Sequence, residues 1–210
     1  MVQAIRPERP AAVVYDIGNV LLDWDPRHLY RKIFADPAEM EWFLGNVCTG
    51  DWNIAQDKGR AWADAEAEAI ARHPAYAGQI RAFRARWQEM VPGAIPGTVA
   101  ILRALAEANV PVYAITNFAS DTLRESVARF AFFKQFRGIV VSGDIGVLKP
   151  DPAIYHRLAS DYGVDLARAV FIDDSEKNVA GARAAGMTAI RFVDATQLRA
   201  ALVALGLPVV

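Results

Sequence analysis

Polar side chains follow four short apolar runs of the sequence, either directly or after a short loop. They are a carboxylate, a hydroxyl with an amide, an ammonium group and a pair of adjacent carboxylates: Asp16, Thr116 with Asn117, Lys149, and Asp173 with Asp174. If the runs are parallel strands, their carboxyl ends meet at one edge of a sheet, where ligands bind in open α/β folds. The set would then bring a nucleophilic carboxylate, a cation and an acidic pair to one site.

Each of these residues taken alone has a simpler structural explanation. Asp16 could be a turn or helix-capping residue, the Thr-Asn pair could cap the next helix, and Lys149 could be a solvated loop lysine. The pair Asp173 and Asp174 is harder to explain in this way, because adjacent carboxylates at the end of a buried strand repel each other unless a cation lies nearby. The joint occurrence of the set, in this order, favours a functional site.

The apolar runs lack polar alternation, which predicts strands that are buried on both faces. They cover residues 11–15, 110–115, 139–141, 169–172 and 188–193. Helical patterns lie between them, over 99–105, over 123–130, from Asp151-Pro152 onward, and over 178–185 before Gly186. Strands that alternate with helices predict a doubly wound, Rossmann-like α/β fold with a parallel sheet.

The segment from residue 25 to residue 94 breaks this alternation. Asp36-Pro37 resembles a helix start, and residues 61–72 are rich in Ala and Glu. A further apolar stripe at helical spacing follows, formed by Ile80, Phe83, Trp87 and Met90. We therefore predict two domains: an α/β core of residues 1–24 and 95–210, and a block of helices, residues 25–94, inserted after the first strand.

The composition is that of a soluble globular protein. The chain has 210 residues, 23 basic against 24 acidic side chains and a formal net charge of -1, whereas a nucleic-acid binder normally carries a basic surplus. The single cysteine, Cys48, excludes an intrachain disulfide and reads as a buried small apolar residue. Residues 1–10 lack the apolar stretch of a signal peptide, and no run is long enough to span a bilayer. We expect a cytoplasmic protein that binds neither nucleic acid nor membranes.

Four segments of the chain together resemble the motifs of the haloacid dehalogenase superfamily. They are Val13-Val14-Tyr15-Asp16-Ile17-Gly18-Asn19-Val20, Ala114-Ile115-Thr116-Asn117, Gly146-Val147-Leu148-Lys149-Pro150-Asp151-Pro152, and Phe171-Ile172-Asp173-Asp174-Ser175, which continues through Asn178 and Gly181. Any one segment is a weak signal, whereas all four in order around a helical insertion are a strong one. The insertion is then similar to the helical cap of that family.

The resemblance implies a phosphatase with an aspartate nucleophile. Asp16 would attack the phosphorus of a small phosphate ester and form an aspartyl-phosphate, which water then hydrolyses. Thr116 and Asn117, with nearby backbone amides, would bind the phosphate oxygens. Lys149 would neutralise the nucleophile and the transferring group, since phosphoryl transfer depends mostly on positioning and on charge neutralisation.

The resemblance also implies a Mg²⁺ cofactor. Its ligands would be the carboxylates of Asp16 and Asp174 and the backbone carbonyl of Gly18, with Asp173 bound directly or through a water. Oxygen ligands and retained waters are what Mg²⁺ prefers. The implied partner is a small-molecule phosphate ester, and the protein would act as a monomer or a homodimer.

One position departs from the family pattern. Most phosphatases of the superfamily carry a second aspartate two residues after the nucleophile as general acid and base, and here that position is Gly18. The leaving group could be a good one, a cap residue such as Asp57 or a water could supply the proton, or the protein could be slow or inert. The Asp-x-Gly-Asn-Val form resembles the bacterial glucose-1-phosphate phosphatase branch, which favours a sugar phosphate.

Other functions stay open at this level. The same nucleophile could attack carbon in a 2-haloacid dehalogenase, although an acidic pair without a metal would repel a carboxylate substrate. A weakly active or inactive binding protein on the same scaffold is the third interpretation, because Gly18 cannot donate a proton.

Four residues of the predicted cap could line a substrate pocket: Trp52, Asn53, Gln56 and Asp57. For Trp52, a place in the cap core is equally consistent with the sequence.

Overall fold

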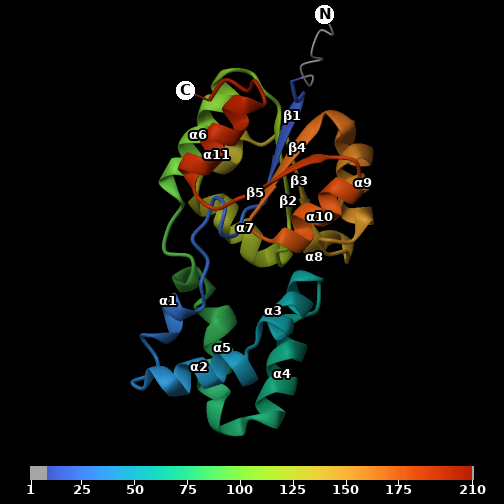
Figure 1. Ribbon diagram of the computed structural model, residues 1–210. Helices are drawn as coiled ribbons and strands as arrows, with labels where there is room; N and C mark the ends of the chain where they lie inside the picture. The colour runs from blue at the N-terminus through green and yellow to red at the C-terminus, as the bar shows by residue number, and fades with distance from the viewer. Residues whose placement is uncertain (1–8, 210) are drawn as a thin grey trace, which may run out of the picture.

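The computed structural model describes residues 9–209, and its centre is a parallel sheet of five strands (Figure 1). Val14 pairs with Tyr113 on one side of its strand and with Phe171 on the other. The strands are β1 (Ala12–Tyr15), β2 (Val112–Thr116), β3 (Gly138–Val141), β4 (Ala169–Asp173) and β5 (Thr188–Arg191), arranged in the order β3-β2-β1-β4-β5. The predicted doubly wound α/β fold is confirmed.

Helices cover both faces of the sheet (Figure 1): α6 (Pro96–Glu107) and α11 (Ala195–Ala204) one face, α9 (Pro152–Tyr162) and α10 (Glu176–Ala184) the other. Successive side chains of β1 enter different clusters, because side chains alternate across a strand. Val13 belongs to the cluster that contains Leu102 of α6 and Leu198 of α11. Val14 belongs to the cluster that contains Leu158 of α9. Burial on both faces explains why this strand is a continuous apolar run.

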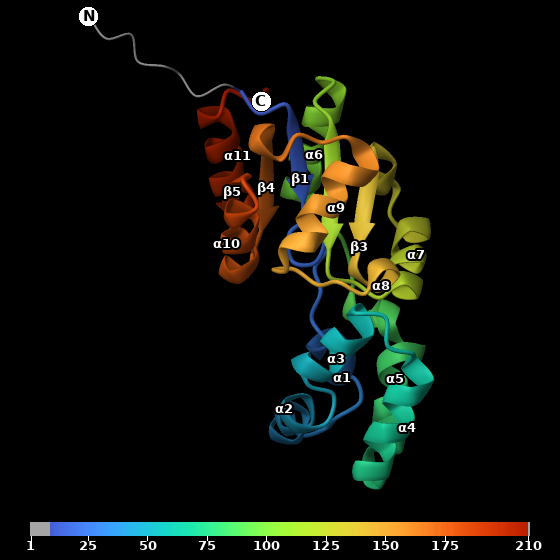
Figure 2. The same ribbon diagram turned by 90° about the vertical axis from the view of Figure 1, so that its right-hand side faces the viewer.

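Residues 27–90, all of which the structure describes, form helices and no strand. The segment lies beyond the carboxyl ends of the strands as a separate lobe, as Figure 2 shows. Its helices are α1 (Arg27–Tyr30), α2 (Pro37–Asn46), α3 (Gly50–Asp57), α4 (Trp62–Arg72) and α5 (Ala77–Ala85), with short 3-10 helices η1 (Pro74–Tyr76) and η2 (Trp87–Met90). Aromatic rings at 5.0 to 6.2 Å between centroids join these helices, among them Tyr30, Phe34, Phe43, Tyr76 and Phe83. These rings form the apolar interior of the lobe, which is continuous with the core on one face of the sheet.

Two helix starts agree with the sequence expectation because an aspartate caps each of them. The side chain of Asp36 accepts the N–H of Ala38 at 2.9 Å, and α2 begins at Pro37. The side chain of Asp151 accepts the N–H of Ala153 at 2.9 Å, and α9 begins at Pro152. An aspartate followed by proline is a strong start signal, since the cap satisfies a free N–H and proline has none to satisfy.

The apolar stripe near the exit of the helical segment is not one helix. α5 ends at Ala85, and after Arg86 the chain continues as the 3-10 helix η2. Trp87 is the first residue of η2, and its ring centroid lies 5.2 Å from that of Phe118, in the loop after β2. The predicted strand over 188–193 is also shorter and ends at Arg191.

Within residues 9–209, none of the helices has the length and apolar character needed to cross a bilayer. The prediction that residues 1–10 contain no signal peptide concerns mostly residues outside that range.

Salt bridges connect the helical segment to α7 (Ser120–Arg129) of the other lobe. Arg84 contacts Asp121 at 2.9 Å and Glu125 at 2.7 Å. These contacts tie the two lobes together beside the carboxyl edge of the sheet.

Candidate active site

Three strand ends and one loop bring the predicted site residues together. Asp16 follows β1, Thr116 and Asp173 are the last residues of β2 and β4, and Lys149 lies in the loop before α9. All four residues are buried, with 8% of the surface of Asp16, 1% of Thr116, 3% of Lys149 and none of Asp173 exposed. Burial of three ionisable groups at one sheet edge is costly unless they pair, so their contacts identify the site.

Lys149 joins the two buried aspartates. Its Nζ lies 2.7 Å from Oδ1 of Asp16 and 2.7 Å from Oδ2 of Asp173. Burial alone would lower the pKa of Lys149, but the two carboxylates raise it above its usual value, so the ammonium stays charged. Burial raises the pKa of Asp16, against the opposing effect of Lys149. One cation between two carboxylates leaves net negative charge at the site.

Asp173 holds this lysine in a fixed direction. Its Oδ1 accepts the N–H of Ser175 at 2.8 Å, and Nδ2 of Asn178 donates to both of its oxygens at 3.0 and 3.1 Å. With Lys149 on Oδ2, most of the acceptor capacity of this carboxylate is used inside the protein. The sequence motif contains Asn178, but its contact with Asp173 could not be derived from spacing, because it depends on the turn from β4 into α10.

Asn117 has a structural contact that the sequence did not indicate. Its Oδ1 accepts the backbone N–H of Lys149 at 2.8 Å, and its Nδ2 donates to the Lys149 carbonyl at 3.1 Å. The side-chain amide is thus occupied by the lysine loop. The neighbouring hydroxyl of Thr116 is different, because its buried Oγ1 has no hydrogen-bond partner among residues 9–209. An unpartnered buried hydroxyl is suited to bind a polar ligand atom at this position.

An acidic cluster lies beside the lysine. Carboxylate oxygens of Asp16, Asp173 and Asp174 lie within 4.8 Å of one another. Burial and the charge of Asp173 raise the pKa of Asp174. A cluster of oxygen donors with excess negative charge fits a hard divalent cation such as Mg²⁺. Asp16, Gly18 and Asp174 also line the adjoining cavity, so a cation there would be accessible to a substrate.

The cavity at Asp16 has a volume of about 400 Å³ and lies between the two lobes. The helical lobe contributes Ile54 of α3 and Trp87 of η2, and the loop after β2 contributes Phe118. Trp24, in the connection from β1 to α1, completes an apolar wall. The substrate space therefore has charged groups at its base, and its walls combine these apolar side chains with polar ones, among them Asn19, Asp51, Asn53 and Asp57.

Of the four cap residues singled out in the sequence, Asn53 and Asp57 line this cavity. Oδ1 of Asp57 accepts the N–H of Ala119 at 3.0 Å, and its Oδ2 accepts from Nδ2 of Asn53 at 3.0 Å. Burial and the negative charge of Asp16 raise the pKa of Asp57 to about 7, although the Ala119 hydrogen bond acts in the opposite direction.

The other two cap residues, Trp52 and Gln56, lie inside the helical lobe. The ring of Trp52 packs against Trp62 and Phe83 at 5.9 and 5.1 Å, and Gln56 is 1% exposed. Cys48 is buried, as expected.

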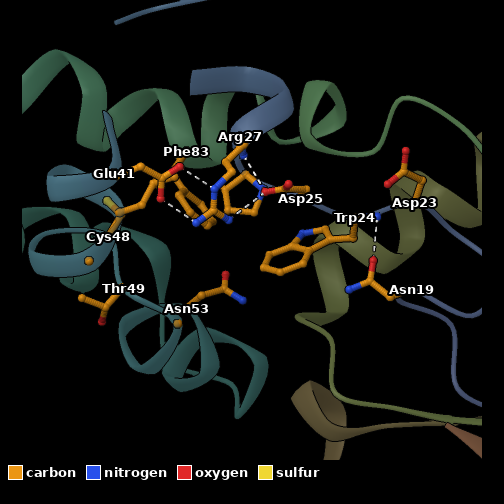
Figure 3. Close-up of a pocket in the computed structure, with 14 residues that line it drawn as sticks. Asn19, Asp23, Trp24, Asp25, Arg27, Glu41, Cys48, Thr49, Asn53 and Phe83 are labelled. Atoms are coloured by element: carbon orange, nitrogen blue, oxygen red, sulfur yellow. Dashed lines mark hydrogen bonds and ion pairs between the residues drawn. The ribbon is translucent and has the colours of Figure 1, made fainter. Parts of the chain in front are cut away.

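A second cavity, of about 600 Å³, continues from the first into the helical lobe (Figure 3). The two cavities share Asn19, Trp24, Gly50 and Asn53 as wall residues. Figure 3 shows Trp24 between Asn19 and the ion pair of Arg27 with Glu41, whose atoms lie 2.7 Å apart. A substrate that extends past Trp24 would therefore enter a space under α2.

A parallel α/β sheet with a buried aspartate, a lysine and an acidic cluster at its carboxyl edge, covered by a helical lobe, is the architecture of a hydrolase class. Residues 10–186 match the haloacid dehalogenase-like hydrolase family, and this chain belongs to that family. The resemblance seen in the four motifs is confirmed.

Similar proteins include phosphatases. A sesquiterpene phosphatase of Aspergillus oryzae is 25% identical over 185 residues, which cover 87% of this chain and 90% of that protein. A glyceraldehyde 3-phosphate phosphatase of Methanopyrus kandleri is 32% identical over 98 residues, which cover 46% of this chain and 42% of that protein.

Solved structures share the fold. A haloacid dehalogenase family enzyme from Bacteroides thetaiotaomicron, in complex with magnesium and inorganic phosphate, is 21% identical with a TM-score of 0.66, over 87% of this chain and 94% of that chain. The L-2-haloacid dehalogenase of Xanthobacter autotrophicus is 20% identical with a TM-score of 0.61, over 86% of this chain and 76% of that chain. At these identities the likeness concerns the fold alone and does not identify the reaction.

Proposed function

We propose that this protein is a Mg²⁺-dependent phosphatase that hydrolyses a small phosphorylated metabolite through an aspartyl-phosphate on Asp16. The observation that carries the proposal is the grouping of Asp16, Lys149 and an acidic cluster around the unpartnered hydroxyl of Thr116. A carboxylate nucleophile, fixed positive charge and a phosphate-binding hydroxyl are the parts that phosphoryl transfer requires. The phosphatases among the relatives of this chain support the same reaction.

Each residue of the site has its own role in this reaction. Asp16 attacks the phosphorus, and its carboxylate becomes an acyl phosphate while the ester oxygen leaves. Lys149 holds Asp16 in place and neutralises charge on the transferring group. Thr116 binds a phosphate oxygen through its hydroxyl. The side chain of Asn117 is bound to the lysine loop, so we assign phosphate contact to its backbone amide and a positioning role to its side chain.

For the metal we propose the carboxylates of Asp16 and Asp174 and the carbonyl of Gly18 as direct ligands. Asp173 would bind through a water, because its oxygens already accept hydrogen bonds from Lys149 and from Asn178. When bound, Mg²⁺ would neutralise the charge of the phosphate and of the carboxylates around it.

We propose that residues 25–94 act as a cap that closes the site, over a core of residues 1–24 and 95–210. The substrate would bind between them, since both lobes contribute to the walls of the cavity at Asp16. We also propose that the enzyme is cytoplasmic and works as a monomer or a homodimer.

For the organic part of the substrate, the cavity favours an apolar group over a sugar. Trp24, Ile54, Trp87 and Phe118 surround the space next to Asp16. Burying an apolar group against them gains roughly 25 cal/mol per Å² of surface removed from water. Sugar hydroxyls would need polar partners, and two of the polar side chains of this cavity, Asn53 and Asp57, already bond to each other. A relative named for a sesquiterpene substrate supports this preference. The sugar phosphate suggested by the Asp-x-Gly-Asn-Val motif is the competing substrate class.

The test is phosphate release from an aryl phosphate, a panel of sugar phosphates and a prenyl monophosphate, with Mg²⁺ or with a chelator. We expect Mg²⁺-dependent release that Asp16→Asn abolishes, with the prenyl ester ahead of the sugar phosphates. Asp64→Asn, an exposed carboxylate on α4, is the matched control and should retain activity. Activity that survives Asp16→Asn or chelation would overturn the mechanism. Chloride release from a 2-haloacid without phosphate release would favour a dehalogenase, and no turnover of any ester would favour a binding protein.

A further inference from the structure

Position 18 lacks a side chain at the point where the reaction needs a proton. When an alkyl phosphate is cleaved, the ester oxygen leaves with the electron pair of the P–O bond and must be protonated. A Cβ at Gly18 would meet no heavy atom within 4 Å, so the glycine is not required by crowding. The backbone there is not in the left-handed region, where an L side chain would be strained. The cavity thus has room for a donor that the chain does not supply from β1.

Two carboxyl groups from outside the acidic cluster line this space, those of Asp51 and Asp57. Asp51 is exposed, whereas hydrogen bonds from Ala119 and Asn53 hold the carboxyl of Asp57. Asp57 is the last residue of α3, and it lines the same cavity of about 400 Å³ as Asp16 and Gly18. Its charge interacts with that of Asp16. It therefore reaches the cavity from the helical lobe, whereas Asp16 and Gly18 reach it from the segment after β1.

The Asp57 side chain has a defined orientation because both lobes hold it. Ala119, in the loop after β2, donates its N–H to Oδ1, and Asn53 donates to Oδ2, each at 3.0 Å. The backbone carbonyl of Asp57 accepts the hydroxyl of Ser142 at 2.5 Å. A carboxyl fixed in this way across the lobe boundary is preorganised for proton transfer and does not need to be ordered by the substrate.

The protonation state of Asp57 suits this role. Burial and the charge of Asp16 raise its pKa to about 7, so a large fraction of the protein carries a proton there near neutral pH. Asn53 can accompany the change, since its buried Oδ1 has no partner among the described residues. Rotation of the amide would offer that oxygen to a protonated Asp57 in place of the N–H that it offers to the carboxylate.

We propose that Asp57 is the proton donor to the leaving group and replaces the aspartate that the sequence lacks at position 18. The inference rests on the phosphatase function proposed above. In the first step the bond from Asp16 to phosphorus forms, the ester P–O bond breaks, and the proton of Asp57 passes to the leaving oxygen. In the second step the oxygen of a water bonds to phosphorus while the Asp57 carboxylate takes a proton from that water. The aspartyl P–O bond then breaks, which returns inorganic phosphate, the Asp16 carboxylate and the protonated Asp57.

The deciding measurement is the ratio of kcat/KM for an alkyl phosphate to kcat/KM for p-nitrophenyl phosphate, because kcat/KM covers the steps up to departure of the leaving group and not the later hydrolysis of the aspartyl-phosphate. An alkoxide needs a proton and a nitrophenolate does not, so loss of the general acid lowers kcat/KM only for the first ester. Asp57→Asn keeps an oxygen that can accept the Ala119 N–H and removes the proton. We expect it to lower the ratio about 100-fold or more. The ratio is taken within one preparation, so a partly unfolded variant does not distort it.

Two further variants sharpen the test. Gly18→Asp in the Asp57→Asn background should raise the ratio again, because the new carboxyl has room beside Asp16. Asp64→Asn, outside the cavity, should leave the ratio at the wild-type value. Equal loss of kcat/KM toward both esters in Asp57→Asn would assign Asp57 a structural role and overturn the proposal, as would a lowered ratio that Gly18→Asp does not raise. A wild-type protein that releases phosphate from neither ester would overturn the proposed phosphatase function itself.

Discussion

Asn117 and Lys149 hold each other through a pair of backbone-directed hydrogen bonds. The Lys149 N–H donates to Oδ1 of Asn117 at 2.8 Å, and Nδ2 of Asn117 donates to the Lys149 carbonyl at 3.1 Å. The end of β2 thereby fixes the loop that carries the lysine. The position of the Lys149 ammonium between Asp16 and Asp173 thus depends on an amide that contacts neither carboxylate.

Asn117→Ala removes both bonds and frees the lysine loop. We expect kcat for an aryl phosphate to fall by about 10- to 100-fold, since small displacements of a positioned group are costly, and the free energy of unfolding to fall by about 1 to 3 kcal/mol. Steady-state kinetics and urea unfolding measure the two effects. Asn46→Ala, an exposed amide that bonds to Trp42 within α2, is the control and should change neither by a comparable amount. Full activity in Asn117→Ala would contradict the positioning role.

Lys149→Met leaves two carboxylates buried without their cation. Breaking a buried pair in this way typically costs about 3 to 5 kcal/mol. The cost should be largest at high pH, because burial raises the pKa of Asp16 and this carboxylate can be neutralised by protonation when the pH falls. Chemical unfolding at pH 5 and pH 8 tests this. The exposed Lys177 of α10, changed to Met, is the control. A variant that is equally destabilised at both pH values would show that the lysine acts through packing and not through charge.

Mg²⁺ should stabilise the protein by binding the acidic cluster. At about 100 times the dissociation constant, binding to the folded state contributes about 2.7 kcal/mol, which corresponds to roughly 5 to 10 °C in Tm for a chain of this size. Asp174→Asn should reduce the shift, because it removes one of the three clustered carboxylates. Thermal unfolding with and without Mg²⁺ gives the comparison, with Asp64→Asn as the variant expected to keep the full shift. A wild-type shift retained in Asp174→Asn would rule this residue out as a ligand.

The raised pKa of Asp57 should also make the free energy of unfolding depend on pH. A carboxyl whose pKa rises from 3.8 in the unfolded chain to about 7 in the folded protein binds protons more tightly when folded. The folded state therefore loses stability relative to the unfolded chain as the pH increases from about 4 to about 7. Asp57→Asn lacks this loss, so its stability relative to wild type should increase over that range by at most about 4 kcal/mol. Unfolding curves at pH 4, 5.5 and 8 measure it, and a constant difference between the two proteins would contradict the prediction.

The apolar wall can be tested at Ile54, which is 42% exposed and lines the cavity at Asp16. Ile54→Asn should raise KM for a prenyl monophosphate by about 5- to 10-fold, equivalent to about 1 kcal/mol of lost apolar contact. KM for a sugar phosphate should change little. Val203→Asn, on α11 and 55% exposed, is the control for the same kind of substitution. An equal increase in KM for both substrates would contradict the proposal that the substrate carries an apolar organic group.

The order of strands and helices, the chemistry of the strand ends and the helical insertion could all be predicted from the sequence. These features depend on local patterns: apolar runs for buried strands, an aspartate before proline for the starts of α2 and α9, and the placing of Asp16, Thr116 and Asp173 after parallel strands. The carboxyl ends of neighbouring parallel strands have to meet at one edge, so the convergence of these residues follows from the topology alone.

Tertiary structure decided which cap residues face the site and what Asn117 contacts. Trp52 and Asp57 lie within a few residues of each other on α3, yet Trp52 packs inside the lobe and Asp57 reaches Ala119, 62 residues further along the chain. Trp87, in the 3-10 helix after α5, packs against Phe118, which lies in the loop after β2. Such contacts depend on how two lobes pack against each other, and no local pattern of apolar and polar residues contains that information.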